Sequence, residues 1–162
     1  MSRTLTDFIA HRVDALAYVT LTRRDDLVVT KIPDGSDLDL LVKMGSPGDR
    51  QLRWLGILHH GVSKSLSDDE ASRELMTWFR QRGKESGVVQ YPFPVIALIF
   101  SMENDEGFYA WRSRPTVNTD KMPILEPQKS PSCEPFTKGA LDDIVTTVNE
   151  WYDSLFSLIA AA

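Results

Sequence analysis

Acidic and imidazole side chains that could hold a metal ion gather between residues 37 and 60, in the runs DLDLLVKM, GSPGD and RQLRWLGILHH. Apolar and polar residues alternate in the first run, which predicts two strands joined by a tight turn. Asp37 and Asp39 would share one strand face, where carboxylate oxygens could bind Mg²⁺. His60 could act as a general base, because the ordinary pKa of histidine lies near neutrality. These two strands are therefore the first candidate for a catalytic or metal site.

A simpler interpretation of the same residues stays open. Alternating charge is usual on an exposed strand face, so Asp37 and Asp39 could form a solvated edge of the hairpin. The side chains of His59 and His60 point to opposite faces of a regular strand, so the pair cannot chelate one ion. On this interpretation the two histidines end the strand and have no ligand role.

Basic residues form a second candidate site, a surface that contacts the phosphates of nucleic acid. Arg80, Arg82 and Lys84 belong to the run RQRGK, and Arg112 and Arg114 lie further along the chain. The alternative is that the run balances the dipole at the end of a helix. A net charge of −5 also argues against a general nucleic-acid coat protein, whose affinity would need a basic field over the phosphates.

Other chemistry has less support in the sequence. Cys133 is the only cysteine and has no nearby histidine in sequence that would lower its pKa, so a thiol nucleophile is not expected. The chain lacks a Gly-rich phosphate loop and the patterns GxSxG, CxxC and HExxH. No stretch resembles a signal peptide or approaches the ~18 apolar residues of a membrane span. We therefore expect a cytoplasmic protein with no membrane role.

The elements that would position these residues follow from length and periodicity. A chain of 162 residues with 42% hydrophobic and 25% charged residues favours one α/β domain over residues 1–162. Apolar residues at helical spacing predict helices at residues 5–16, 68–82 and 138–159. Central strands are predicted at 37–44 and 51–58, a hairpin or two short strands in AYVTLT and LVVTKI, and a second hairpin from PFPVIALIF and GFYAWR. Residues 113–136 contain five of the nine prolines and are predicted to be a Pro-rich surface loop.

Two stretches resemble a bacterial family of unknown function within the PD-(D/E)XK nuclease superfamily. SDLDLLVKM and LRWLGILHHG look like its GIDxxV … FxVQVK hairpin, and YPFPVIALIFSMENDEGFYAWRSRP looks like its PVxLVxxD … YYxW … P segment. The resemblance covers most of residues 5–115 and implies a restriction-endonuclease-like fold, with a mixed sheet flanked by helices. It places Asp39 at the strand aspartate that binds Mg²⁺, Leu58 at the second metal ligand and His60 at the lysine.

These substitutions favour a non-catalytic relative of the nucleases. A leucine cannot bind Mg²⁺, so we expect a binding or interaction module with no cofactor and a protein partner, in bacterial defence or DNA processing by family analogy. The alternative is a divergent Mg²⁺-dependent DNA endonuclease, in which Asp39 and Asp37 hold the ion and His60 replaces the lysine. A homodimer is expected if the last helix leaves an apolar stripe exposed.

Overall fold

The computed structural model describes residues 4–33, 36–45, 50–82 and 90–162, which form three helices and seven strands. In chain order these are α1 (Leu5–Leu21), β1 (Leu27–Lys31), β2 (Leu40–Met44), β3 (Arg53–Val62), α2 (Asp68–Arg82), β4 (Val95–Ser101), β5 (Gly107–Val117), β6 (Pro123–Pro127), β7 (Glu134–Pro135) and α3 (Lys138–Ala161). The predicted α/β class is confirmed, and α2 has the predicted bounds.

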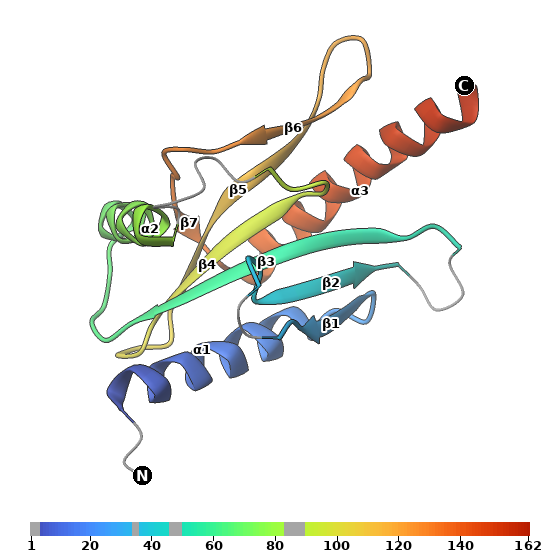
Figure 1. The fold of residues 1–162 in the computed structure, drawn as a ribbon. Helices are drawn as coiled ribbons and strands as arrows, with labels where there is room; N and C mark the ends of the chain where they lie inside the picture. The colour runs from blue at the N-terminus through green and yellow to red at the C-terminus, as the bar shows by residue number, and fades with distance from the viewer. Residues whose placement is uncertain (1–3, 34–35, 46–49, 83–89) are drawn as a thin grey trace.

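All seven strands belong to one mixed sheet, in the order β1-β2-β3-β4-β5-β6, with β7 also paired to β5 (Figure 1). Strands β1, β2 and β3 form an antiparallel meander. Helix α2 then carries the chain to β4, which runs parallel to β3. Strand β5 returns antiparallel to β4, as the sequence predicts for this hairpin.

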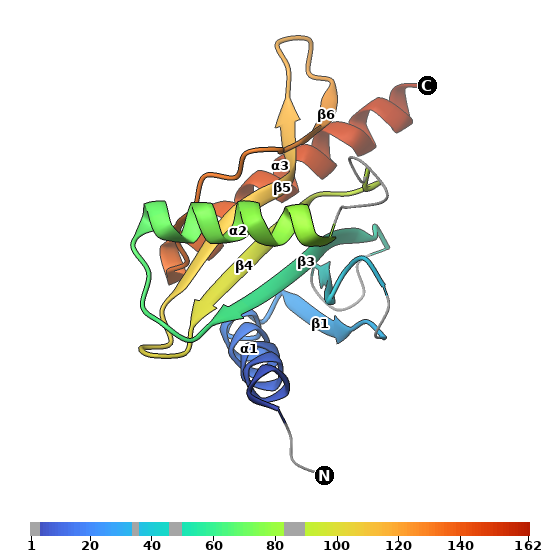
Figure 2. The same ribbon diagram turned by 60° about the vertical axis from the view of Figure 1, so that its left-hand side comes forward.

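The helices cover both faces of the sheet (Figure 2). On one face, α1 and α3 bury a core that includes Ala17, Ile57 and Val148. On the other, α2 packs over a second core that includes Leu58 and Leu75. Strand β4 is buried along its whole length because it lies in the middle of the sheet between the two layers.

Helix α1 is longer than predicted, because it takes in the AYVTLT run that the sequence suggests as a strand. Ala17 and Leu21 continue the buried stripe that begins at Val13, and both are fully buried. The β-branched Thr20 is accommodated because its hydroxyl donates a hydrogen bond of 2.7 Å to the carbonyl of Leu16. Tertiary burial therefore outweighs the local preference for a strand.

The prediction of an irregular loop at residues 113–136 is wrong, because this segment contains the end of β5 and the strands β6 and β7. The amide of Gln128 donates to the carbonyl of Arg112, so the hydrogen-bonded pairs of β5 and β6 fall at even-numbered positions. Pro115, Pro123 and Pro127 therefore occupy non-hydrogen-bonded pairs, where the missing N–H costs no ladder bond.

Helix α3 begins at the predicted residue and ends two residues later than the predicted 159. Its N-terminus is capped by the Thr137 side chain, which accepts from the amide of Ala140 at 3.1 Å. Among the described residues, no helix has the length and apolar character that crossing a membrane would require.

Candidate functional site

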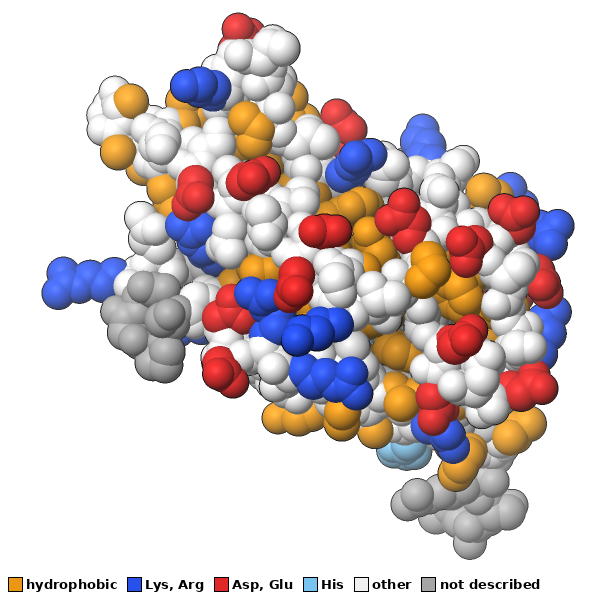
Figure 3. Space-filling model, turned by 180° about the vertical axis from the view of Figure 1, so that it is seen from behind, with side chains coloured by type: hydrophobic (Ala, Val, Ile, Leu, Met, Phe, Trp, Pro, Cys, Tyr) orange, Lys and Arg blue, Asp and Glu red, His pale blue; other side chains and the backbone are white. Residues whose placement is uncertain are grey.

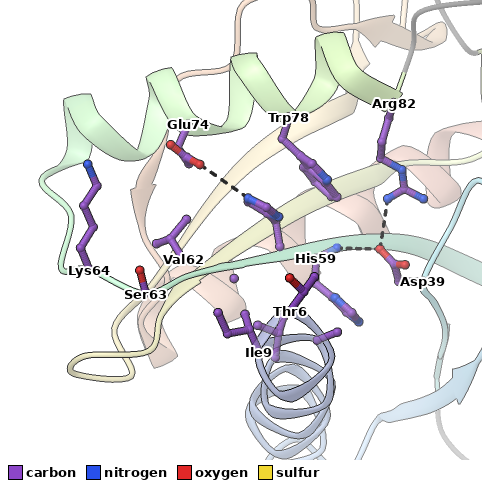
Figure 4. Close-up of a pocket in the computed structure, with 14 residues that line it drawn as sticks. Thr6, Ile9, Asp39, His59, Val62, Ser63, Lys64, Glu74, Trp78 and Arg82 are labelled. Carbon is purple, nitrogen blue, oxygen red and sulfur yellow. Dashed lines mark hydrogen bonds and ion pairs between the residues drawn. The ribbon is translucent and has the colours of Figure 1, made fainter. Parts of the chain in front are cut away.

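A cavity of about 630 Å³ opens beside the C-terminal half of β3, between α1 and α2 (Figure 4). Helix α1 contributes an apolar wall and α2 a polar and aromatic one, while β3 forms the floor. The lining residues are Thr6, Ile9, Ala10, Val13, Asp39, His59, His60, Gly61, Val62, Ser63, Lys64, Glu74, Trp78 and Arg82.

The cavity exists because β2 is shorter than β3. Pairing between the two strands ends where Leu40 lies opposite Ile57, whereas β3 continues to Val62. Beyond Ile57, β3 is paired with β4 alone among the described strands. Its other edge faces the space that α1 and α2 enclose from the two sides of the sheet.

Asp39 lies immediately before β2 and not within it, which corrects the prediction that it shares a strand face with Asp37. Its backbone amide donates to the carbonyl of Ile57 at 2.9 Å, and its carboxylate accepts from the amide of His59 at 2.9 Å. A guanidinium nitrogen of Arg82 lies 3.3 Å from the same oxygen. Asp39 therefore continues the edge pairing of β3 with a side chain and carries a cationic partner from α2.

Arg82 also holds the chain segment that leads into β2. Its second terminal nitrogen donates to the carbonyls of Ser36 at 3.4 Å and Asp37 at 3.3 Å. Its guanidinium carbon lies 5.1 Å from the ring centroid of Trp78. One side chain of α2 thus connects residues 36–39 to the wall of the cavity.

His60 points to the face that α2 covers. Its ring stacks on Trp78, with 4.9 Å between centroids and 15° between planes, and its Nε2 lies 3.7 Å from a carboxylate oxygen of Glu74. Burial lowers the pKa of His60 below its ordinary value, although Glu74 acts in the opposite direction. The imidazole is therefore neutral at pH 7, and the charge of Glu74 is left without an imidazolium to balance it.

His59 points to the opposite face, as strand alternation requires. Its Nε2 lies 2.5 Å from Asp14 of α1, whose other carboxylate oxygen is 2.5 Å from the ammonium of Lys31. Burial alone would raise the pKa of Asp14, but the hydrogen bonds from Lys31 and His59 hold it below its ordinary value. Each histidine is thus partnered by a carboxylate, with no hydroxyl or thiol that would form a nucleophile–base pair within the described contacts.

The structure brings two of the three predicted acidic and imidazole site residues together. Asp39 and His60 line the same cavity, whereas Asp37 is exposed and contributes only a backbone carbonyl to Arg82. Leu58 is 3% exposed and packed in the core beneath α2. Within the described residues no three His, Cys, Asp or Glu side chains are grouped to hold a metal ion. One carboxylate already paired with a guanidinium does not suit Mg²⁺, which prefers several oxygen ligands.

Two of the predicted phosphate-contact residues, Arg80 and Arg82, point to different sides of α2. Arg82 faces the cavity, while Arg80 lies two residues earlier, about 200° around the helix, and its guanidinium contacts Met76. Lys84 lies outside the described residues. Arg112 is half-buried, with its guanidinium carbon 4.4 Å from the Phe79 ring centroid. On the face shown in Figure 3, acidic and basic side chains are interspersed.

Several cavity residues are missing from the sequence-based candidates. Glu74 and Trp78 recur at four-residue intervals with Arg82, which the sequence analysis names only as a phosphate contact, so the three form one stripe of α2 that helical spacing alone could have revealed. Asp14 is not one of the lining residues but is the partner of His59, and it gives no such signal because this pairing spans 45 positions in the sequence.

The chain has no significant match among protein-family models, curated proteins or solved structures, so the geometry of this cavity is the basis for assigning a function.

Proposed function

We propose that this protein is a non-catalytic module of restriction-endonuclease-like architecture with a binding or interaction role. The element order supports the fold proposal: a helix, a three-stranded meander, a helix that crosses to a parallel strand, and a further antiparallel strand. By family analogy the partner is a protein of a bacterial defence or DNA-processing system.

The observation that carries the proposal is the environment of Asp39. Arg82 supplies the positive charge that a metal ion would bring in a nuclease, and the His59 amide occupies the same carboxylate oxygen. Leu58, at the position of the second ligand, is closed into the core. A metal ion would have to displace Arg82, and the described residues offer no group of three His, Cys, Asp or Glu side chains to hold it, so weak metal affinity is expected.

Calorimetric titration with Mg²⁺ and Mn²⁺, beside a cleavage assay on single- and double-stranded DNA, tests this proposal. The wild-type chain should show no metal binding at millimolar concentration and no cleavage. Arg82→Gln should gain weak metal binding that is lost again in Arg82→Gln/Asp39→Asn. Arg80→Gln on the same helix is the matched control and should behave as wild type. DNA cleavage by the wild-type chain that Asp39→Ala abolishes would overturn the proposal.

One observation favours a second candidate, a Mg²⁺-dependent DNA endonuclease that uses Asp39 and His60. The two side chains line one open cavity, as such an enzyme would need. The neutral His60 could accept a proton from an attacking water. The same cleavage assay decides between the candidates, because this enzyme would lose its activity in both Asp39→Ala and His60→Ala.

A homodimer remains part of the proposal. Leu158 and Ile159, near the end of α3, are 42% and 61% exposed, and Met122 of the adjacent β5–β6 connection is 42% exposed. Size-exclusion chromatography with light scattering should report twice the monomer mass of 18.3 kDa. A cytoplasmic location also stays a prediction.

A further inference from the structure

The open edge of β3 presents backbone groups that no described strand pairs with. The amide of His59 points to the β2 side, where it meets Asp39, and the carbonyl of Ile57 points the same way. Strand alternation repeats every two residues, so the carbonyl of His59 and both the amide and the carbonyl of Gly61 also point to this side. The pairing of β3 with β4 is regular through Val62, so no bulge reverses this alternation.

The residues that carry these groups, His59 and Gly61, line the cavity, and β3 has no strand other than β4 beside it there among the described residues. An edge that presents free N–H and C=O groups is a template for another strand. The cavity therefore has the hydrogen-bonding floor that an extended peptide requires.

The two helices give this edge the shape of a groove. Ile9 and Val13 of α1 lie on one side and Glu74 and Trp78 of α2 on the other, and α1 approaches so closely that a Cβ on Gly61 would lie 2.4 Å from Val13. A strand placed here would continue the line of β2, with Asp39 marking one end. About four residues fit between Asp39 and the end of β3 at ~3.3 Å per residue.

The charged side chains of the groove indicate which kind of peptide would bind there. The carboxylate of Asp39 is paired with Arg82, whereas the carboxylate of Glu74 faces a neutral His60 and is 38% exposed. Side chains of an added strand would alternate between the apolar wall of α1 and the wall of α2 that carries Glu74. A lysine or arginine would complement Glu74, and small apolar residues on either side of it would face Ile9 and Val13.

We propose that the groove between α1 and α2 binds an extended peptide by strand addition to the edge of β3 at Gly61, with a basic side chain of the peptide against Glu74. This inference rests on the proposed function, since it assigns a class of ligand to the same cavity. Peptides bound in this way gain affinity from main-chain hydrogen bonds and specificity from alternate side chains.

The test begins with a displayed library of random decapeptides selected on the full-length chain. The same selection is run on Glu74→Lys and on the matched charge reversal Asp143→Lys, which lies on α3 away from the groove. Peptides enriched on the wild-type chain should carry a lysine or arginine between apolar residues. Their affinity should fall at least tenfold on Glu74→Lys and less than twofold on Asp143→Lys.

Synthetic copies of an enriched peptide then test the hydrogen bonding. Two versions of the peptide carry backbone N-methyl groups, one at its odd-numbered and one at its even-numbered residues. One version should bind at least tenfold more weakly and the other less than twofold more weakly, because only alternate N–H groups of the peptide face β3. Binding should also slow hydrogen exchange at the Gly61 amide.

Failure to enrich peptides over Glu74→Lys, or equal effects of methylation in both registers, would overturn the proposal. So would tighter binding of a DNA oligonucleotide at the same groove. None of these readouts uses a metal ion, so a failure here would leave the titration and cleavage results on Asp39 unaffected.

Discussion

Because α1 packs closely against β3, adding a methyl group at Gly61 should destabilise the fold, and a second substitution in α1 should restore part of the lost stability. A Cβ there would lie 2.4 Å from Cγ2 of Val13 and 2.6 Å from Cγ2 of Ile9. Carbon atoms that are not bonded normally stay about 3.5–4.0 Å apart, so Gly61→Ala creates an overlap of about 1 Å against a buried wall. We expect the free energy of unfolding to fall by about 1–3 kcal/mol, the usual cost of overpacking.

Removal of the methyl groups of Val13 should relieve part of this overlap. Val13→Ala alone should cost about 2 kcal/mol, because Val13 is 1% exposed and loses buried apolar contacts. In Val13→Ala/Gly61→Ala the total loss should be smaller than the sum of the single losses by at least about 1 kcal/mol. Urea denaturation followed by circular dichroism measures all four proteins of this cycle.

Gly139→Ala is the matched control for this cycle. A Cβ at Gly139 meets only the Thr137 hydroxyl, at 3.9 Å, and alanine has the higher helix propensity, so this variant should be neutral or slightly more stable than wild type. Additive losses in the Val13 and Gly61 cycle would refute the packing of α1 against β3. The wall of the proposed peptide groove would then have to be placed elsewhere.

Three further outcomes follow from the contacts of single side chains. Tyr152→Phe should lower the unfolding free energy by about 1–3 kcal/mol in urea denaturation, because its hydroxyl bonds both the amide and the carbonyl of Trp54; an unchanged midpoint would contradict this pairing. Burial lowers the pKa of His60 in the folded state, so the free energy of unfolding should fall as the pH drops through the ordinary histidine pKa. Urea midpoints measured between pH 5 and 7.5 should therefore depend less on pH in His60→Phe than in the wild-type chain. The exposed control His11→Gln should behave as wild type. Burial raises the pKa of Cys133 to about 11, so at pH 8 a disulfide reagent should label the native thiol far more slowly than the urea-unfolded one, and complete labelling of both at equal rates would contradict its burial.

The sequence predicts the elements whose apolar residues follow a clean period. The sequence of α2 has acidic residues at positions 68–70 and a glycine at position 83, just after the predicted end, and the helix forms with the predicted bounds. Helix α1 shows where local signals fail: Val19 and Thr20 favour a strand, yet burial of Ala17 and Leu21 extends the helix. Prolines 115, 123 and 127 show a second limit, since only the register of the strands reveals that the missing amides cost nothing.

The same contrast between local and long-range information holds for the candidate site. The sequence singles out Asp39 and His60 because both lie in one predicted hairpin of polar and apolar residues. Their partners come from distant elements: Asp14 lies 45 residues before His59, and Arg82 lies 43 residues after Asp39. A pattern in one segment carries no information about a pairing that depends on how the helices lie across the sheet.

Metal binding at Asp39 and peptide binding in the groove exclude one another, because both depend on the position of Arg82. A metal ion at Asp39 requires Arg82 to leave, and Arg82 also holds the carbonyls of Ser36 and Asp37 beside the end of β2. Loss of these contacts would free the segment that closes one end of the groove, where the added peptide strand is expected to stop. A variant that gains metal binding by losing Arg82 should therefore bind the peptide more weakly. Arg82 would thus both occupy the carboxylate that a metal ion needs and hold in place the segment at which the bound peptide ends.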